Sequence, residues 1–253
     1  MPSPVHNVEQ VLAAHPAVVA LPPRLRALLD EALAEAGNST DVVLAELVDT
    51  LDSLVLLNAD GEAVLATILH ALPALATRLE PRLADAEPAV AALLDGQHAA
   101  NQVWALHAER SGQGSAEGLR RLLLAIVRDL RVVPILLARQ LAQLRMASQL
   151  PEDERRALAQ LTRDIHAPLA NRLGIWQLKW ELEDLAFRHL DPDTYRRIAR
   201  LLDDKRAGRE AYIAEVTQTL REALAAQGID GDVAGRPKHI YSIWKKMQKK
   251  DVP

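Results

Sequence analysis

The sequence predicts a mainly α-helical protein, and three observations support this fold class. Apolar residues fill 49% of the 253 positions while aromatic residues fill only 3%, so a core must be built from Leu, Ala and Val. Alanine and leucine are among the strongest helix formers. Between the breaks in the chain, apolar residues recur at spacings of three and four, which is the period of a helix with one buried face.

Helix starts and breaks divide the chain into helical segments. The breaks contain Gly, Pro, Asn or Ser and fall at 21–23, 37–40, 58–61, 111–114, 148–151 and 228–235. The apolar stripe from 119 to 130 is typical of a helix, with Ser115 as its cap. Pro151 with three acids after it, and Asp191 with Pro192 after it, indicate two further helix starts.

Two local patterns depart from this regular helical order. Pro134 lies inside an otherwise unbroken helical run, where it removes one backbone hydrogen bond, so we expect it to kink or split the helix. The stretch 227–235 is rich in Gly and Asp, with Ile229 and Val233 alternating with polar residues. It is the one plausible start of a strand in the sequence.

Composition excludes several classes of protein. With no cysteine, the chain has neither disulfides nor cysteine-bound zinc, as is typical of a reducing cytosol. No signal peptide precedes the first segment, and no apolar run approaches the ~18 residues of a membrane span. We therefore expect a soluble, cytoplasmic protein with no membrane partner, while no pattern indicates its oligomeric state.

The stretch 235–250, GRPKHIYSIWKKMQKK, concentrates positive charge near the end of the chain, and is called the basic segment below. It contains no acid, and its six Lys and Arg residues are Arg236, Lys238, Lys245, Lys246, Lys249 and Lys250. Since the whole chain has a net charge of −4, the remainder carries −10. A charge run is usually a solvated face, but a distribution this polarised indicates an anionic partner.

The basic segment, together with IHAPLANRLGIWQLKWELEDLAFRHLDPDTYRRIARLLDDKR at 165–206, resembles the long-form RelA/SpoT alarmone synthetases. These bacterial enzymes make, and in some members degrade, (p)ppGpp. The resemblance is strong over residues 119–250. It implies an HD-type helical hydrolase-like domain at 1–150, connecting helices at 151–206, and the first elements of an α/β nucleotidyltransferase-like synthetase domain at 207–253.

In the family, the HD domain uses a divalent metal to activate water, and its ligands come from an HP motif, an HD pair and a KLADR-like segment. A Glu-Asp pair after the HD motif helps the chemistry. The corresponding positions here are Glu46 for the first His, His70 and Ala71 for the HD pair, Ala74 and Leu75 for the Glu-Asp pair, and Arg139 for the ligand Asp, with Ala142 at the His of the KLADR-like segment. A cation at a ligand position repels a divalent ion, so we expect the Mn²⁺ site and the hydrolase activity to be lost.

The isolated candidate residues have plainer interpretations as well. His70 is interpreted as a helix histidine satisfied by a local partner, and the alternative is a surviving two-ligand site of Glu46 and His70. The acids Glu181 and Glu183 are interpreted as solvated residues of an amphipathic helix rather than as catalytic groups. Two other histidines are interpreted as incidental surface residues, His98 and His107.

The resemblance also implies a Mg²⁺-dependent transfer of pyrophosphate from ATP to the 3′-hydroxyl of GDP or GTP. It assigns Arg236, Lys238 and Lys246 to the ATP phosphates, whose charge must be neutralised during transfer. The chain ends at Pro253, before the family's Mg²⁺-binding Asp, catalytic Glu and guanine-stacking loop. We therefore expect a piece of a longer protein that is inactive alone and holds no cofactor, with ribosome and uncharged tRNA contacted by regions beyond it.

Three functional hypotheses follow. The leading one is the N-terminal region of a synthesis-only, RelA-type GTP pyrophosphokinase of the stringent response, whose pseudo-hydrolase domain has a regulatory or scaffold role. The second is a residual metal-dependent (p)ppGpp 3′-pyrophosphohydrolase. The third is a helical module that binds RNA or the ribosome through the basic segment, where aromatic residues among cations suit stacking on bases.

Overall fold

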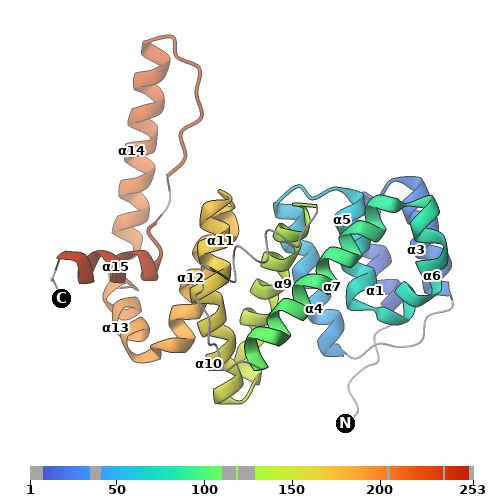
Figure 1. Cartoon of the computed structure of the whole chain (residues 1–253). Coiled ribbons are helices and arrows are strands. Elements are labelled where there is room, and N and C mark those ends of the chain that lie inside the picture. Colours follow the sequence, from blue (N-terminus) through green and yellow to red (C-terminus); the bar gives the residue numbers. More distant parts are fainter. Residues whose placement is uncertain are drawn as a thin grey trace. The chain divides into compact units, whose positions relative to one another are not determined.

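The computed structural model describes residues 8–34, 41–109, 118, 129–203, 206–235 and 237–250. Its helices are α1 (Val8–Ala14), α2 (Pro16–Val19), α3 (Pro23–Ala34), α4 (Asp41–Leu56), α5 (Gly61–Ala71), α6 (Pro73–Ala86), α7 (Pro88–Glu109), α9 (Val132–Met146), α10 (Glu152–Leu161), α11 (Ala167–Arg172), α12 (Trp176–Leu190), α13 (Pro192–Asp203), α14 (Arg206–Ala226) and α15 (Ile240–Lys250), with a 3₁₀ turn η1 (Ala147–Gln149) and a π-helical turn η2 (Thr162–His166) (Figure 1). The described residues contain no strand, which confirms the all-helical fold class.

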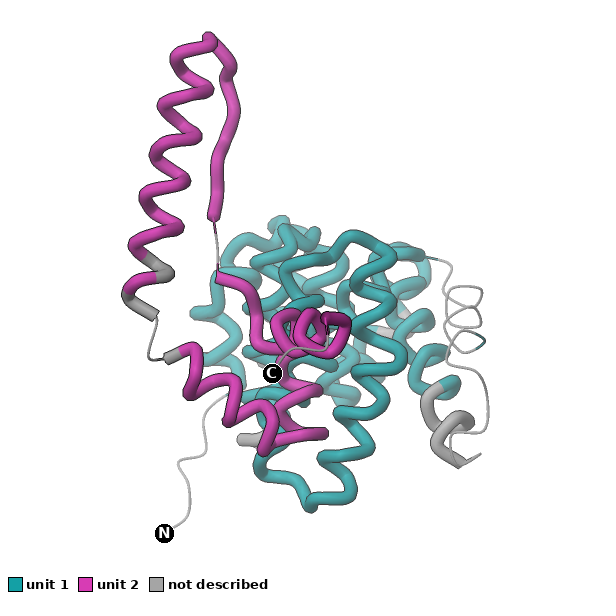
Figure 2. Tube along the Cα trace, turned by 90° about the vertical axis from the view of Figure 1, so that its left-hand side faces the viewer, with its two compact units in different colours: residues 1–182 teal, residues 183–253 magenta. Residues whose placement is uncertain are grey.

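The chain divides into two compact units, residues 1–182 and 183–253, with α12 running across the division (Figure 2). The boundaries expected from the sequence, at 150 and 206, remain a prediction. Among the described helices, none is by itself long and apolar enough to cross a membrane. Gly61–Ala71 and Pro73–Leu79 pass that test of length and composition only as a pair, which is bent by 116°.

The core of the first unit is built from leucine-rich helix faces. Helix α4 packs along α9, and α5 packs along α7 (Figure 1). The α4 face buries Leu47, Leu51 and Leu54, and the facing residues of α5 and α9 are as fully enclosed. Such burial of apolar surface, at roughly 25 cal/mol per Å², is the main force that holds these helices together. The aliphatic core expected from the composition is therefore the one that forms.

A glycine lets α7 approach the first turn of α9 closely. A Cβ atom at Gly96 would lie 2.6 Å from Cγ2 of Val132, which is too close for any side chain. The next residues along α7, Gln97 and Asn101, face the same neighbourhood, so this approach brings their amides near α9.

Arg131 fixes the start of α9 against α5. Asp60 caps α5 by accepting a hydrogen bond from the Ala63 amide at 2.9 Å, and its other oxygen accepts one from Arg131 at 2.7 Å. Asp129 pairs with the same guanidinium, which lowers the pKa of the Asp129 carboxyl and raises that of Arg131. Arg131, the residue just before α9, is therefore held by two carboxylates, Asp60 and Asp129.

Some of the expected helix boundaries agree with the structure and others differ from it. The starts at Glu152 and Pro192 are confirmed, and the Thr194 amide donates to the Asp191 carboxylate at 3.1 Å as a cap. Of the two outcomes expected at Pro134, a kink or a split, the structure has a break in the helical run: the chain turns at 129–131 and α9 begins at Val132, which places Pro134 in its first turn, where no internal hydrogen bond is lost. Residues 119–128 of the helix expected at 119–130, its cap Ser115 and the breaks at 37–40 and 111–114 lie outside the described residues, while 129 and 130 form a bend and a turn.

The strand expected within 227–235 is wrong for the described chain. After α14 the backbone runs without regular structure from Ile229 to Gly235. It packs back on α14 of the same unit, where the Arg221 guanidinium donates to the Val233 carbonyl at 2.9 Å and Gly235 lies against Ile213. A strand needs a hydrogen-bonded neighbour along its edge, and no described segment supplies one.

Candidate functional site

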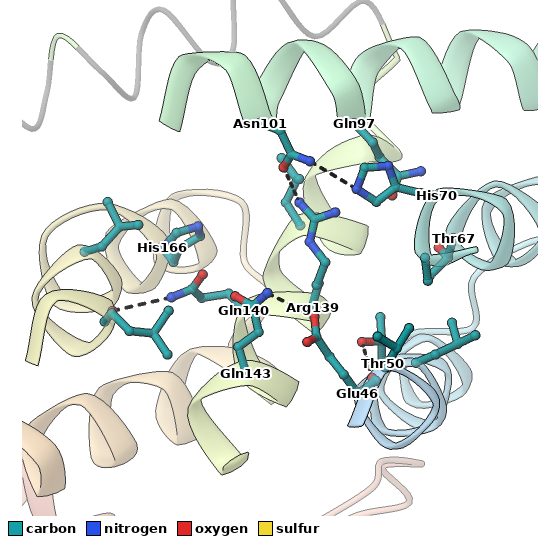
Figure 3. Close-up of a pocket in the computed structure, with 16 residues that line it drawn as sticks. Glu46, Thr50, Thr67, His70, Gln97, Asn101, Arg139, Gln140, Gln143 and His166 are labelled. Carbon is teal, nitrogen blue, oxygen red and sulfur yellow. Dashed lines mark hydrogen bonds between the residues drawn. The ribbon is translucent and has the colours of Figure 1, made fainter. Parts of the chain in front are cut away.

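A cavity of about 420 Å³ opens in the first unit among α4, α5, α7, α9, α10 and η2 (Figure 3). Its size is that of a small-molecule site. Its lining combines leucines with amides, two histidines, one cation and one carboxylate: Val43, Glu46, Leu47, Thr50, Thr67, His70, Ala71, Gln97, Asn101, Leu136, Arg139, Gln140, Gln143, Leu158, Leu161 and His166.

Four residues singled out in the sequence meet in this cavity. Glu46 comes from α4, His70 and Ala71 from the end of α5, and Arg139 from α9. Side chains that are far apart in the sequence therefore line one cavity, as expected for a site built from several helices. Two other candidate positions do not line it: Leu75 is buried in the first turn of α6, and Ala74 is exposed beside it.

Three side chains form a hydrogen-bonded chain whose direction is fixed. The Arg139 Nη2 donates to Asn101 Oδ1 at 2.6 Å, and Asn101 Nδ2 lies 3.1 Å from His70 Nε2 (Figure 3). Because a guanidinium can only donate, the Asn101 oxygen must face Arg139, and its amide nitrogen then faces His70. Since that nitrogen can only donate, Nε2 of His70 must accept, and its lone pair is engaged.

The environment keeps His70 neutral. Burial, the nearby Arg139 charge and His98 lower the pKa of His70 to about 4. With Nε2 accepting, the single ring proton resides on Nδ1, which is buried and has no hydrogen-bond partner among the described residues. An unpartnered buried N–H costs about 1–3 kcal/mol, so this arrangement is maintained at some expense of stability.

Arg139 carries its charge in a partly desolvated position. Burial lowers the pKa of Arg139, while the charge of Glu46 acts in the opposite direction. A guanidinium nevertheless stays protonated at neutral pH. Among the described residues Glu46 forms no ion pair with it, and the Glu46 Oε1 accepts a hydrogen bond from Gln143 Nε2 at 2.9 Å.

The far wall of the cavity contains a helix irregularity. In η2 the Ala167 amide bonds to the Thr162 carbonyl, five residues back, just before Pro168, which has no N–H to continue the regular pattern. Gln140 Nε2 donates to Thr162 Oγ1 at 2.7 Å and so joins this turn to α9. His166, only 2% exposed, lines the cavity, and burial lowers its pKa to about 3.

A second cavity, of about 340 Å³, lies among α5, α6 and α7 and shares His70 with the first. His98 and Asp95 are among its lining residues. The side chain of His98 is exposed, as expected from the sequence, but its ring centre lies 5.2 Å from that of His70. It therefore belongs to the surroundings of the candidate site. The side chain of His107 lies outside the described residues.

No group of three His, Cys, Asp or Glu side chains is placed to hold a metal ion in the part of the chain that the structure describes. Around the first cavity the available groups are Glu46 and the two histidines His70 and His166. Glu46 is bonded to Gln143, and His70 offers no free lone pair.

An ion-pair network joins three helices, two of which, α4 and α9, line the cavity. Arg145 of α9 donates to Asp49 of α4 at 2.6 Å and to both oxygens of Glu181 of α12, at 2.7 and 2.6 Å. These two acids raise the pKa of Arg145. Glu181, expected to be a solvated acid, is thus a bidentate partner that holds three helices in register.

The basic segment belongs to the second unit. Asp184 of α12 accepts hydrogen bonds from the amides of Ile240 and Tyr241, at 3.3 and 2.8 Å, and so holds the start of α15. The Phe187 ring packs against Tyr241 and Trp244 in tilted arrangements, with ring centres 5.7 and 4.8 Å away. The lysines Lys238 and Lys246 are exposed, while Arg236 lies outside the described residues.

Sequence reasoning missed most of the polar lining. Asn101, Gln97, Gln140 and Gln143 have no local pattern that marks them, because each is a single amide on an otherwise ordinary helix. His166 lies within the segment that carried the family resemblance, next to Pro168, and this proline was the available signal of an irregular helix.

The sequence matches a known family of proteins and several relatives. A model described as "HD domain" matches residues 26–176, more than half of the chain. GTP pyrophosphokinase of Escherichia coli (strain K12) is 51% identical over 154 residues, covering 61% of this chain and 21% of the relative. GTP pyrophosphokinase of Haemophilus influenzae is 42% identical over 221 residues, which cover 85% of this chain and 29% of that relative.

A third relative bears a different name. The probable guanosine-3′,5′-bis(diphosphate) 3′-pyrophosphohydrolase of Synechocystis is 47% identical over 137 residues, covering 54% of this chain and 18% of the relative. The chain thus spans between 18% and 29% of the length of these three relatives.

Proposed function

Because the chain belongs to the HD domain family and is homologous to the GTP pyrophosphokinases of the RelA/SpoT family, we propose that it is the N-terminal part of a RelA-type, synthesis-only enzyme making (p)ppGpp. In this proposal its HD domain is a pseudo-hydrolase. The observation that carries the proposal is the Arg139 guanidinium, hydrogen-bonded to Asn101 in the cavity where the metal would be held.

The side chains present do not fit a divalent metal. A catalytic metal site needs several converging neutral or anionic ligands with lone pairs to donate. The cavity offers Ala71 and Arg139 where the resemblance expects two aspartates, and the His70 Nε2 lone pair is already bonded to Asn101. A cation at the centre of the site adds Coulombic repulsion to this shortage of ligands.

The intact helical scaffold supports a regulatory or scaffold role. Arg145 of α9 bonds to Asp49 of α4 and to Glu181 of α12, and so links two helices that line the cavity to α12. A change in the cavity that moves α9 would therefore be felt by α12. Such coupling becomes allostery only when two states and a coupling free energy are measured. Equal synthesis and regulation in a longer protein lacking residues 1–140 would contradict this role.

The basic segment supports the synthetase half of the proposal. Lys238 precedes α15, Lys246 lies within it, and both are exposed; together with Arg236 they are proposed to bind the ATP phosphates. Mg²⁺ and GDP or GTP would be held by parts of the longer protein. A lysine cluster neutralises the charge of a transferring diphosphate without covalent chemistry.

Hydrolysis assays test the pseudo-hydrolase directly. The chain is incubated with ppGpp and Mn²⁺, and released pyrophosphate is measured, with the Synechocystis relative as a matched positive control. We expect no release above that of the buffer from this chain, and release from the control. Turnover by this chain would favour the alternative function, a residual 3′-pyrophosphohydrolase. The name of the Synechocystis relative is the observation that supports this alternative.

A further inference from the structure

Arg139 has more hydrogen-bonding capacity than the protein uses. A guanidinium carries five N–H donors in a planar fork. In the described structure its hydrogen bond goes to Asn101, and no carboxylate lies within ion-pair distance. Burial also lowers its pKa, so the guanidinium is desolvated without a direct counter-ion. A half-buried cation in this state favours an anion supplied from outside.

The neighbouring polar groups are already committed to the protein. Gln140 donates to Thr162, Gln143 donates to Glu46, and Gln97 donates to the Ala66 carbonyl at 3.2 Å. Arg139 is therefore the charged group with donors left over for a ligand, and the buried Nδ1–H of His70 is a second, neutral donor without a partner among the described residues. A guanidinium fork matches the paired oxygens of a phosphate better than any other side chain does.

Glu46 restricts the choice of ligand. Its charge acts on Arg139 without direct pairing, and one of its oxygens is bonded to Gln143. A ligand that places an anion on Arg139 gains most if it offers a hydroxyl or amino donor to the other oxygen of Glu46, because a bare anion there meets only repulsion. The cavity volume of about 420 Å³ is enough for such a molecule.

We propose that this cavity binds a small phosphate-bearing ligand with a hydroxyl or amino donor, held through Arg139, and that Glu46 selects against bare phosphates. The proposal rests on the proposed function, since it requires that no metal occupies the cavity. It assigns the emptied hydrolase site a ligand class, and thereby a place where a regulatory signal enters the helical unit.

Calorimetry with the whole chain, in EDTA to exclude bridging metals, tests the proposal with pyrophosphate, ribose 5-phosphate and malonate as probes. We expect ribose 5-phosphate to bind more tightly than pyrophosphate, and malonate not to bind. Arg139→Met should weaken phosphate binding by about tenfold or more, as expected for a lost hydrogen bond to a charged group. Arg163→Met, an exposed cation outside the cavity, should change nothing.

Glu46→Gln gives a readout of opposite sign. It removes the repulsion, so pyrophosphate should bind more tightly than in the wild type while ribose 5-phosphate loses its advantage. Misfolding cannot produce a gain in affinity, and thermal unfolding of each variant is measured alongside. Arg139→Lys keeps the charge without the fork and should lie between wild type and Arg139→Met.

Three results would overturn the proposal: no binding of either phosphate at millimolar concentration, binding undiminished in Arg139→Met but lost in Lys238→Ala with Lys246→Ala, or a preference for malonate. These failures are separate from failure of the pseudo-hydrolase, which would appear as Mn²⁺ binding in the same protein without EDTA.

Discussion

The chain uses cations in two contrasting ways. In the first unit a single guanidinium, Arg139, is withdrawn into a cavity and bonded to one amide. In the second unit the lysines of α15 are exposed, and Lys245 lies over the Tyr241 ring with its Nζ 5.5 Å from the ring centre. Water and salt screen the exposed group but reach the buried one poorly. A single desolvated cation can therefore define a binding site, whereas exposed cations bind an anion through their combined charge.

The largest expected difference between Arg139 and the lysines of α15 is in how strongly salt weakens the binding of an anion. If the basic segment binds RNA through the four lysines of α15, as the third hypothesis from the sequence holds, the RNA affinity should fall roughly 50-fold between 50 and 200 mM salt, through counterion release. Pyrophosphate binding at Arg139 should fall by less than about fivefold, because a single partly buried contact is involved. Titrations at both salt concentrations measure this. Equal salt dependence, or RNA binding unaffected by changing the four lysines to Gln, would remove the distinction.

A second prediction concerns pH and the buried side of the comparison. The pKa values of His70 and His166 are lowered to about 4 and about 3 in the folded chain, against about 6.5 when unfolded. Between these values the unfolded chain binds more protons, so stability is lost as the pH falls below about 6.5. The fully buried His166 should contribute about 2 kcal/mol of this loss between pH 7 and pH 5, and the more accessible His70 less.

Urea unfolding at both pH values, with wild type and His166→Gln, measures this contribution. The variant should be less sensitive to acid by about 2 kcal/mol, because glutamine does not titrate. The same acid sensitivity in both proteins would mean that the imidazole is accessible to protons in the folded state.

A third prediction tests the direction of the Arg139–Asn101–His70 chain. In Asn101→Asp a carboxylate would accept from both neighbours, so His70 could carry its second proton on Nε2. We expect the pKa of His70 to rise from about 4 toward its ordinary value of about 6.5, as followed by NMR titration of the ring protons. A pKa that stays near 4 would show that Asn101 does not set the protonation of His70.

Sequence reasoning predicted the parts that depend on local rules. The helices follow from periodicity and composition, and the starts at Glu152 and Pro192 follow from their caps. The positions Glu46, His70, Ala71 and Arg139 were found through a family resemblance, and they do line one cavity. Periodicity alone would have given no reason to group them.

The remainder depends on tertiary contacts that no local pattern encodes. The role of Asn101 requires that α7 approach α9, which Gly96 permits. Pro134 alone did not decide between a kink and a split, because the same proline is disruptive within a helix and harmless in its first turn, where α9 places it. The strand expected in 227–235 needed a partner that no described segment supplies.

Exclusion of a divalent metal from the cavity is what separates a pseudo-hydrolase from a residual hydrolase. Calorimetric titration of Mn²⁺ into the wild-type chain, beside Ala71→Asp with Arg139→Asp, tests this most directly. We predict no saturable binding to the wild type at millimolar Mn²⁺, and measurable binding to the double variant, in which carboxylates replace the cation and the methyl group. One equivalent of Mn²⁺ bound by the wild type at micromolar concentration would contradict the account, because His70 would then have to release Asn101 and Arg139 would have to leave the cavity.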